Sequence, residues 1–469
     1  MNIAFVPIDN RPVCYTLAEQ ICAINSGINL FIPEREWLGD LTKYAQTDKI
    51  FEWLKNLPSV DALVLSLDTI AYGGLISSRR CEESFEQIKE RVQKLKDILV
   101  EKSAKVYAFS SIMRISNNNI NEEEKEYWSR WGKKIFEYSY NTHKNGCPPQ
   151  SDIPEEILED YLSTRKRNFE INKIYLEFQK QGLFNTLVFS KDDCAEYGFN
   201  VKEAETLENS GGFVKTGADE IPLTLLARAV NEFYAIPSFQ KDRTETVLPP
   251  LHSSLKIAPV FLEPEYKDLI SNYEDVSIEQ SVKGQIELAG CKISEPLDAD
   301  ILLYVNNFKK HQGEIVMKVP SEPFNGLWAK PDKPYMIADV RFANGADNAF
   351  VEKLLESNFD DNFYGYSAWN TSANTLGSLI CAAVVKYHAS SSPLNFNSSL
   401  FKELQVVRFL DDWAYQANVR QKLTKPDEKE IKHMMKPFED RIFHKFGVKY
   451  DVSYKFPWER LFEVEVCIS

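Results

Sequence analysis

The chain has 469 residues, 43% of them hydrophobic, and a formal net charge of −14, which is typical of a globular protein with a large buried core. Its length fits two or three domains. The acidic balance, with no cluster of Lys and Arg, disfavours a nucleic-acid partner, because binding to a phosphate backbone depends on clustered cations. No stretch approaches the roughly 20 apolar residues of a membrane span, and no secretory signal is recognisable. We therefore expect a cytoplasmic protein that does not bind membranes.

Eight short apolar runs alternate with helical patterns along the chain. The runs cover residues 3–8, 62–67, 105–110, 186–190, 256–262, 300–305, 335–340 and 363–368. Runs that are apolar throughout are typical of strands buried on both faces of a parallel sheet. Between them, residues 84–99 have apolar side chains at three- and four-residue spacing, and residues 154–181 run from a proline to a glycine, as helices do. The alternation predicts an α/β fold, either TIM-barrel-like or an open sheet.

Two polar stretches rich in Pro, Ser or Asn interrupt this alternation, at residues 235–256 and 388–399. Such stretches are typical of linkers between packed units. We therefore expect an N-terminal, barrel-like α/β domain at 1–240, a smaller second α/β unit at 256–390, and a helical C-terminal segment at 400–469.

The eight cysteines and six histidines are dispersed. They lack Cys-x-x-Cys or His-x-x-x-His spacing, so we expect buried free thiols, no zinc, no structural metal and no cofactor.

Polar motifs follow the predicted strands, at the position where α/β proteins bind ligands. PIDNRP follows the first strand and is either part of a ligand site or a turn with a structural Asp–Arg pair. SLDTIAYGGLISSR follows the second, and its Gly73-Gly74 would let the backbone approach a ligand closely. GADEIPLTLLARA places two acidic residues in the first turn of a helix, where they complement the helix macrodipole, although Asp219 is also a ligand candidate.

SKDDCAEYG places Asp192 and Asp193 directly after the predicted strand at 186–190. Like-charge repulsion and unequal burial can separate the pKa values of two carboxyls, so that one keeps a proton while the other keeps its charge. Acid/base cleavage of a glycosidic bond needs such a pair. The alternative is a helix N-cap, for which Asp is a common residue. We take Asp192 and Asp193 as the candidate catalytic residues.

DVRFANGAD and YSAWNTSANTLG each follow a later strand. An aromatic ring beside amides and hydroxyls suits a sugar, whose faces are apolar and whose rim needs hydrogen bonds. The alternative is a capped helix start with a core tryptophan. The candidate substrate-binding residues from all the motifs are Asp9, Asn10, Arg11, Asp68, Tyr72, Arg79, Arg114, Asp219, Asp339, Asn344, Trp369, Asn370 and Asn374.

Taken together, PIDNRP, GGLISSR, SKDDCAEYG, GADEIPLTLLARA, DVRFANGAD and YSAWNTSANTLG resemble the bacterial domain-of-unknown-function family 4127, from residue 1 to about 390. The resemblance implies a cytoplasmic bacterial protein of this size and brings no established activity. A looser similarity, confined to Asp192-Asp193 and Trp369-Asn370, is to barrel glycosidases that cleave 2-acetamido sugars with substrate assistance.

Three functions are open on this basis. The first is a glycoside hydrolase acting on an N-acetylated amino sugar or similar small saccharide, in which Asp192 orients the acetamido group and Asp193 protonates the leaving oxygen. The second is a hydrolase that binds Mg²⁺ or Mn²⁺ through Asp9, Asp68, Asp192 and Asp193. The third is a non-catalytic protein that closes two α/β lobes over a polar metabolite.

Overall fold

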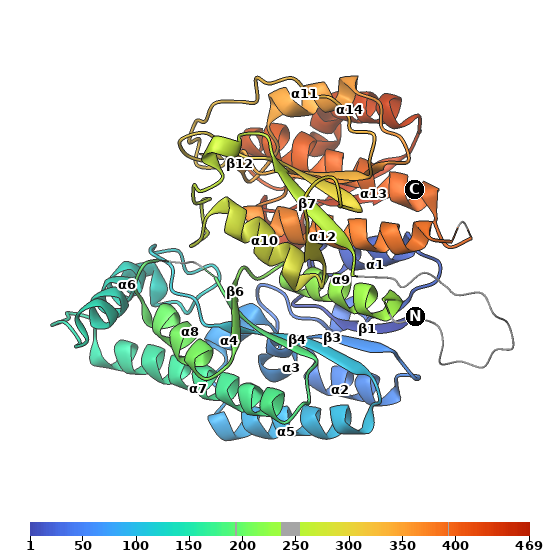
Figure 1. Ribbon diagram of the computed structural model, residues 1–469. Coiled ribbons are helices and arrows are strands. Elements are labelled where there is room, and N and C mark those ends of the chain that lie inside the picture. Colours follow the sequence, from blue (N-terminus) through green and yellow to red (C-terminus); the bar gives the residue numbers. More distant parts are fainter. Residues whose placement is uncertain (193–194, 236–253, 393) are drawn as a thin grey trace, which may run out of the picture. The chain divides into compact units, whose positions relative to one another are not determined.

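The computed structural model describes residues 1–192, 195–235, 254–392 and 394–469 (Figure 1). The chain forms two compact units: the first comprises Met1–Tyr15 and Leu30–Pro222, and the second Thr16–Asn29 and Leu223–Ser469. Each contains one parallel sheet with alternating helices, which confirms the predicted α/β class. Over the described residues both sheets are open rather than closed into barrels. The predicted boundary at 235–256 lies almost entirely outside these residues.

The first sheet has six strands, of which the inner ones match the predicted apolar runs. β1, β3, β4, β5 and β6 pair in parallel. The order across the sheet is β2 (Asn29–Phe31), β1 (Asn2–Val6), β3 (Ala62–Ser66), β4 (Lys105–Ile112), β5 (Thr186–Lys191) and β6 (Phe213–Thr216).

The core of the first unit lies between one face of this sheet and a layer of helices (Figure 1). The predicted helix at 84–99 begins with a capping box between Ser84 and Gln87 and buries the apolar side that its periodicity indicates. The helices of this unit are α2 (Thr47–Asn56), α3 (Leu67–Tyr72), α4 (Leu75–Arg80), α5 (Phe85–Glu101), α6 (Trp128–Asn145), α7 (Glu155–Lys180) and α8 (Phe199–Asn209).

The second sheet has five parallel strands. Their order is β8 (Lys292–Ile293), β7 (Lys256–Phe261), β9 (Ile301–Asn306), β11 (Tyr335–Asp339) and β13 (Phe363–Ser367). A further parallel pair joins β10 (Gly313–Glu314) to β12 (Phe342–Ala343). Helices α10 and α12 contact the sheet, and α1 packs on α12. The helices are α1 (Thr16–Ala23), α9 (Ile221–Tyr234), α10 (Ile278–Leu288), α11 (Asn348–Glu356) and α12 (Ser372–Ser390).

The C-terminal segment is helical as predicted and belongs to the second unit. It consists of α13 (Ser398–Arg408), the π-helix η3 (Phe409–Val419) and α14 (Glu428–Phe446). An antiparallel hairpin of β14 (Val452–Lys455) and β15 (Glu465–Ile468) follows, which the sequence did not predict. Short 3₁₀ helices are η1 (Arg35–Trp37), η2 (Pro264–Tyr266), η4 (Arg420–Lys422) and η5 (Pro457–Glu459).

The two sheets have the same winding, although the sequence has no recognisable repeat. In each, the second strand in the chain lies on one side of the first and the third strand lies on the other. The switch points are therefore between β1 and β3 and between β7 and β9. In open α/β sheets, ligands bind outside the carboxyl ends of the strands at such a point.

Across the described parts of the chain, no helix is both long and apolar enough to cross a membrane. The seven cysteines in those parts are all free thiols; five are buried, whereas Cys147 is exposed and Cys467 is partly exposed.

Candidate functional site

Asp9 and Arg11 form a buried ion pair directly after β1, on one side of the first switch point. Arg11 donates to Asp9 from its backbone nitrogen and from Nε, both at 2.9 Å. Its two terminal nitrogens donate to the two carboxylate oxygens of Asp219, at 3.2 and 2.6 Å. Burial raises the pKa of Asp9, and Arg11 offsets part of that effect. Asn10 contributes backbone contacts, since its carbonyl accepts from Arg35 Nε at 2.8 Å.

Asp68 lies directly after β3, on the other side of the same switch point. It is 1% exposed, and one of its oxygens accepts from the backbone nitrogen of Ser111 at 2.8 Å. Burial raises the pKa of Asp68 to about 7, against the weaker opposing effects of Ser111 and of the Arg79 charge. The next residue, Thr69, donates to the carbonyls of Pro7 and Ile8 at 2.7 and 2.9 Å. The loops after β1 and β3 are thus bound to each other.

Buried serines extend this edge from β3 across β4 to β5. Ser111 on β4 pairs in register with Ser190 on β5, and the Ser190 hydroxyl donates to the Ser111 hydroxyl at 3.1 Å. Ser110 donates to Asn172 Oδ1 at 2.7 Å, and Asn172 donates to the Ser111 carbonyl at 3.1 Å. Ser111 therefore contacts the carboxyl of Asp68 through its backbone nitrogen and Ser190, at the end of β5, through its hydroxyl. The sequence did not indicate these serines, because a serine within an apolar strand belongs to no recognisable motif.

Two arginines at the same edge share a pair of glutamates. Arg79 donates to Glu124 at 2.7 Å, and Arg114 donates to Glu124 at 3.1 Å and to Glu123 at 2.9 Å. Arg114 also lies 3.5 Å from Asp192 Oδ2. The side chain of Asp192 is 38% exposed. The two glutamates also escaped the sequence reasoning, since they lie in a charged stretch far from any predicted strand.

The other candidates of the first unit have different surroundings. Tyr72 belongs to the hydrophobic core, and its hydroxyl has no hydrogen-bond partner. Gly73 and Gly74 have φ of 84° and 138°, in the region that favours glycine. Asp193 lies outside the described residues, so the Asp192-Asp193 pair stays a prediction.

The edge of the second sheet carries a buried carboxylate network. Asp339 accepts from Asn306 Nδ2 at 2.8 Å, from the Asp347 backbone nitrogen at 2.8 Å, and from the Tyr366 hydroxyl at 3.1 Å. Burial, reinforced by the charge of Asp347, raises the pKa of Asp339 to about 7. Arg341 is fully buried beside this group and donates to Asn306 Oδ1 at 3.0 Å. These buried polar groups therefore have hydrogen-bond partners in one another.

Trp369 and Asn374 form a capped helix start. Trp369 is 3% exposed, and its ring packs edge-on against Phe462 with centroids 6.1 Å apart. Thr371 caps α12 by accepting from the Asn374 backbone nitrogen at 3.3 Å. Asn374 Oδ1 is buried without a hydrogen-bond partner. The arrangement favours a capped helix start with a tryptophan in the core over an exposed tryptophan ring that binds a sugar.

The structure brings Asn344 and Asn370 together in an unusual backbone conformation. Their φ angles are 60° and 57°, in the left-handed region, and the Asn344 nitrogen donates to the Asn370 carbonyl at 2.8 Å. Residues other than glycine adopt this region at a cost, and asparagine tolerates it better than most. Such strain concentrates at functional edges of folds.

We expect Asn370→Ala to lower the free energy of unfolding by about 1 kcal/mol, because alanine pays a larger penalty at positive φ. Asn370→Gly should cost less, since glycine adopts this region without a Cβ clash. Urea unfolding of the two variants measures the difference. Equal stability of the two would contradict the strain at this position.

Residues that no motif indicated complete the second edge. Asp411 and Asp412 lie on the π-helix η3, and Arg408 donates to Asp411 at 3.2 Å and also pairs with Asp412. Asp412 accepts from the Ala368 backbone nitrogen, at the end of β13, at 2.6 Å. Burial raises the pKa of Asp411 to about 7, an effect that Arg408 partly offsets. Isolated π-helical turns are frequent at functional sites. Asp411 and Asp412 lie in the charged C-terminal segment, where adjacent aspartates usually belong to the exposed face of a helix. The sequence therefore did not indicate them as site residues.

Among the residues that the structure describes, no group of three or more His, Cys, Asp or Glu side chains is arranged to hold a metal ion. At Asp9 and Asp219 the cation is the Arg11 guanidinium.

The fold and these edges define a protein of two doubly wound α/β units, each with arginines and raised-pKa carboxyls at the carboxyl ends of its strands. The chain belongs to the family described as protein of unknown function (DUF4127), whose model matches residues 3–467. The resemblance seen in the motifs is thereby confirmed. No curated protein and no solved structure matches the chain.

Proposed function

We propose that the chain is a glycoside hydrolase that acts on an N-acetylated amino sugar or a similar small saccharide at the edge of the first sheet. One observation carries the proposal: two carboxyls of this edge lie in opposite environments. Asp68 is buried and has a pKa of about 7, whereas Asp192 faces solvent and Arg114. Cleavage of a glycosidic bond requires one carboxyl that keeps a proton and one that keeps its charge.

The proposed reaction assigns a separate task to each carboxyl. The acetamido oxygen of the substrate attacks the anomeric carbon while the bond to the leaving oxygen breaks, and Asp68 supplies the proton that this oxygen takes. Asp192 orients the acetamido group and stabilises the charge that develops on it. Water then opens the cyclic intermediate and returns a proton to Asp68.

This assignment changes the roles expected from the sequence in one respect. Asp68 replaces Asp193 as the proton donor, since its burial supplies the raised pKa that a general acid needs. Asp9 and Asp219 hold Arg11, so their task is to fix the loop after β1. A divalent metal at Asp9 would have to displace this guanidinium, which favours the glycosidase over the metal hydrolase. The free thiols of the described residues support a reducing compartment such as the cytoplasm.

A panel of aryl glycosides tests the proposal, with 2-acetamido sugars among them. We expect turnover of at least one, and we expect Asp192→Asn to lower kcat by about 10²-fold or more, because the amide cannot balance the developing positive charge. Asp97→Asn, on the exposed side of α5, is the matched control and should be fully active. A purified, folded protein that hydrolyses none of the glycosides, or an Asp192→Asn variant as active as the control, would overturn the proposal.

A further inference from the structure

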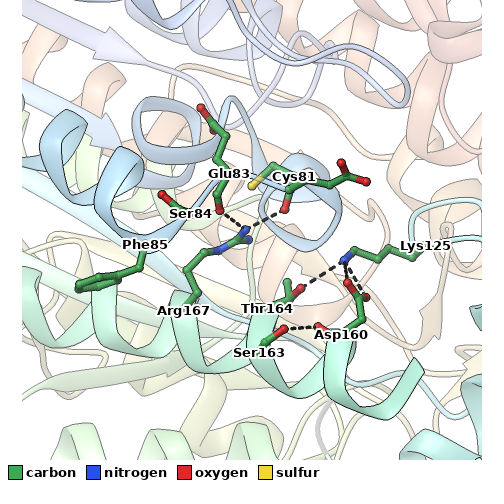
Figure 2. A pocket seen from close by; sticks show the side chains of 10 residues that line it. Cys81, Glu83, Ser84, Phe85, Lys125, Asp160, Ser163, Thr164 and Arg167 are labelled. Carbon is green, nitrogen blue, oxygen red and sulfur yellow. Dashed lines mark hydrogen bonds and ion pairs between the residues drawn. The ribbon is translucent and has the colours of Figure 1, made fainter. Parts of the chain in front are cut away.

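Two pockets of the first unit share the ion pair between Lys125 and Asp160 in their linings. The first holds about 390 Å³ and the second about 580 Å³, and both are lined by Glu82, Lys125 and Asp160. Figure 2 shows the first pocket, with Phe85 toward one end and the ion pair toward the other. None of these residues belongs to the motifs from which the proposed function was argued.

Several hydrogen bonds hold the ion pair that the two pockets share. Lys125 Nζ donates to both carboxylate oxygens of Asp160 at 2.7 Å and to the Thr164 hydroxyl at 3.2 Å. The Tyr127 hydroxyl donates to Asp160 at 2.9 Å from the side of the second pocket. The three donors of Lys125 are thus engaged, and the pair offers an occupant of either pocket the remaining acceptor sites of the Asp160 carboxylate.

The arginines of the pockets are already engaged with backbone carbonyls. Arg167 donates to the carbonyls of Cys81, Glu83 and Ser78 at 2.7 to 2.9 Å. Arg80 donates to the carbonyls of Glu124 and Leu41 at 3.0 and 2.8 Å, and to two others. The guanidinium donors of both arginines are therefore used by backbone carbonyls. A phosphate or carboxylate ligand is disfavoured, because it is best bound by a guanidinium whose donors are free.

Each pocket also presents one partly exposed aromatic ring, Phe85 in the first and Tyr127 in the second. Hydroxyl and carboxylate groups also line the first pocket, among them Ser163 and Asp160, and Asp160 accepts from the Tyr127 hydroxyl. A ring for an apolar face and acceptors for hydroxyl groups are the features that suit a neutral sugar. Glu124, which lines the second pocket, is the residue that Arg79 and Arg114 share at the sheet edge.

We propose that the two pockets bind successive units of a neutral oligosaccharide, with the Lys125–Asp160 ion pair between the two sugars. The inference rests on the proposed function for the class of ligand and extends it, since it makes the natural substrate a chain rather than a single sugar. The pockets then hold the part of the chain beyond the cleaved bond.

Calorimetric titration of the Asp68→Asn variant tests this without turnover. The probes are N-acetylglucosamine and the trisaccharides N-acetylchitotriose, cellotriose and maltotriose. We expect one trisaccharide to bind at least about tenfold more tightly than the monosaccharide. Phe85→Ala and Tyr127→Ala should each weaken that binding about tenfold, and the milder Asp160→Asn should also weaken it. Phe213→Ala, an exposed aromatic on β6 outside both pockets, is the control and should bind normally.

The outcomes separate this inference from the proposed function. Trisaccharide binding that depends on Phe85 and Tyr127 supports the pockets even if no glycoside is hydrolysed. Absence of binding by all three trisaccharides, unchanged affinity in folded variants, or binding of spermidine in their place would overturn the inference. In that case turnover of aryl glycosides by the unmodified protein would leave the proposed function standing.

Discussion

Asp68→Asn is expected to lower the rate of glycoside hydrolysis by about 10²–10⁴-fold, which is the usual contribution of a general acid. Asparagine keeps the size of the side chain and an oxygen that can accept from the Ser111 backbone nitrogen, so the contact at 2.8 Å can persist. The proton is lost, and with it the ability to protonate the leaving oxygen. Initial rates and circular dichroism on the same preparations separate loss of chemistry from loss of fold.

The identity of the leaving group sharpens this test. A general acid matters most when the departing oxygen is strongly basic, so the variant should lose more activity on a phenyl glycoside than on the 4-nitrophenyl glycoside. Asp97→Asn should keep the wild-type ratio of the two rates. Equal losses on both substrates would show that Asp68 acts on binding or folding rather than on proton transfer.

The same substitution has a consequence for stability. The pKa of Asp68 is about 7 in the folded protein and 3.8 for the unperturbed group, so folding favours the protonated form. The contribution of Asp68 to stability is therefore fully present below about pH 4, is lost as the pH rises to about 7, and stays lost above that. The loss is on the order of 4 kcal/mol. We expect the stability of Asp68→Asn to lack this pH-dependent loss.

The second large effect is expected in the second unit, where Arg341→Met should lower the free energy of unfolding by about 3–5 kcal/mol. The Arg341 side chain is fully buried and donates to Glu263 at 2.9 Å and to Asn306 at 3.0 Å, with Asp347 at 3.5 Å. Methionine fills much of the volume but leaves the buried carboxylate of Asp347 without this cation. Urea unfolding at neutral pH measures the loss.

Arg441→Met is the matched control for Arg341→Met. Arg441 pairs with Glu352 on the surface, where both side chains are about half exposed. Surface ion pairs contribute about 0–1 kcal/mol, so this variant should be nearly as stable as the wild type. Similar losses in the two variants would contradict the buried network as the source of stability.

The sequence was sufficient to predict the elements that are buried on both faces. All eight apolar runs correspond to strands, and the helix predicted at 154–181 is α7 (Glu155–Lys180). The edge strands β2, β6 and β8 were missed because they are two to four residues long and none of their residues is fully buried. A strand of this kind is stabilised by its neighbour in the sheet and leaves no periodic pattern.

The candidate site was predictable in part, for the same physical reason. Asp9, Arg11 and Asp68 follow buried strands, and the topology places the ends of adjacent parallel strands together. The environment of each carboxyl was not predictable, because burial and hydrogen bonding come from distant segments. Ser111 approaches Asp68 from another strand, and Glu124 reaches Arg114 from a loop. Such contacts decide which carboxyl keeps its proton.

The pH dependence of kcat/KM on a phenyl glycoside tests the central claim most directly, because it reports the protonation state that hydrolysis needs. With Asp68 as the general acid, the rate should fall as the pH rises through about 7, where the buried carboxyl loses its proton. The residual activity of Asp68→Asn should lack this fall. A wild-type rate that is constant or increasing between about pH 6 and 8, or a fall retained in the variant, would contradict the assignment of Asp68 as the proton donor.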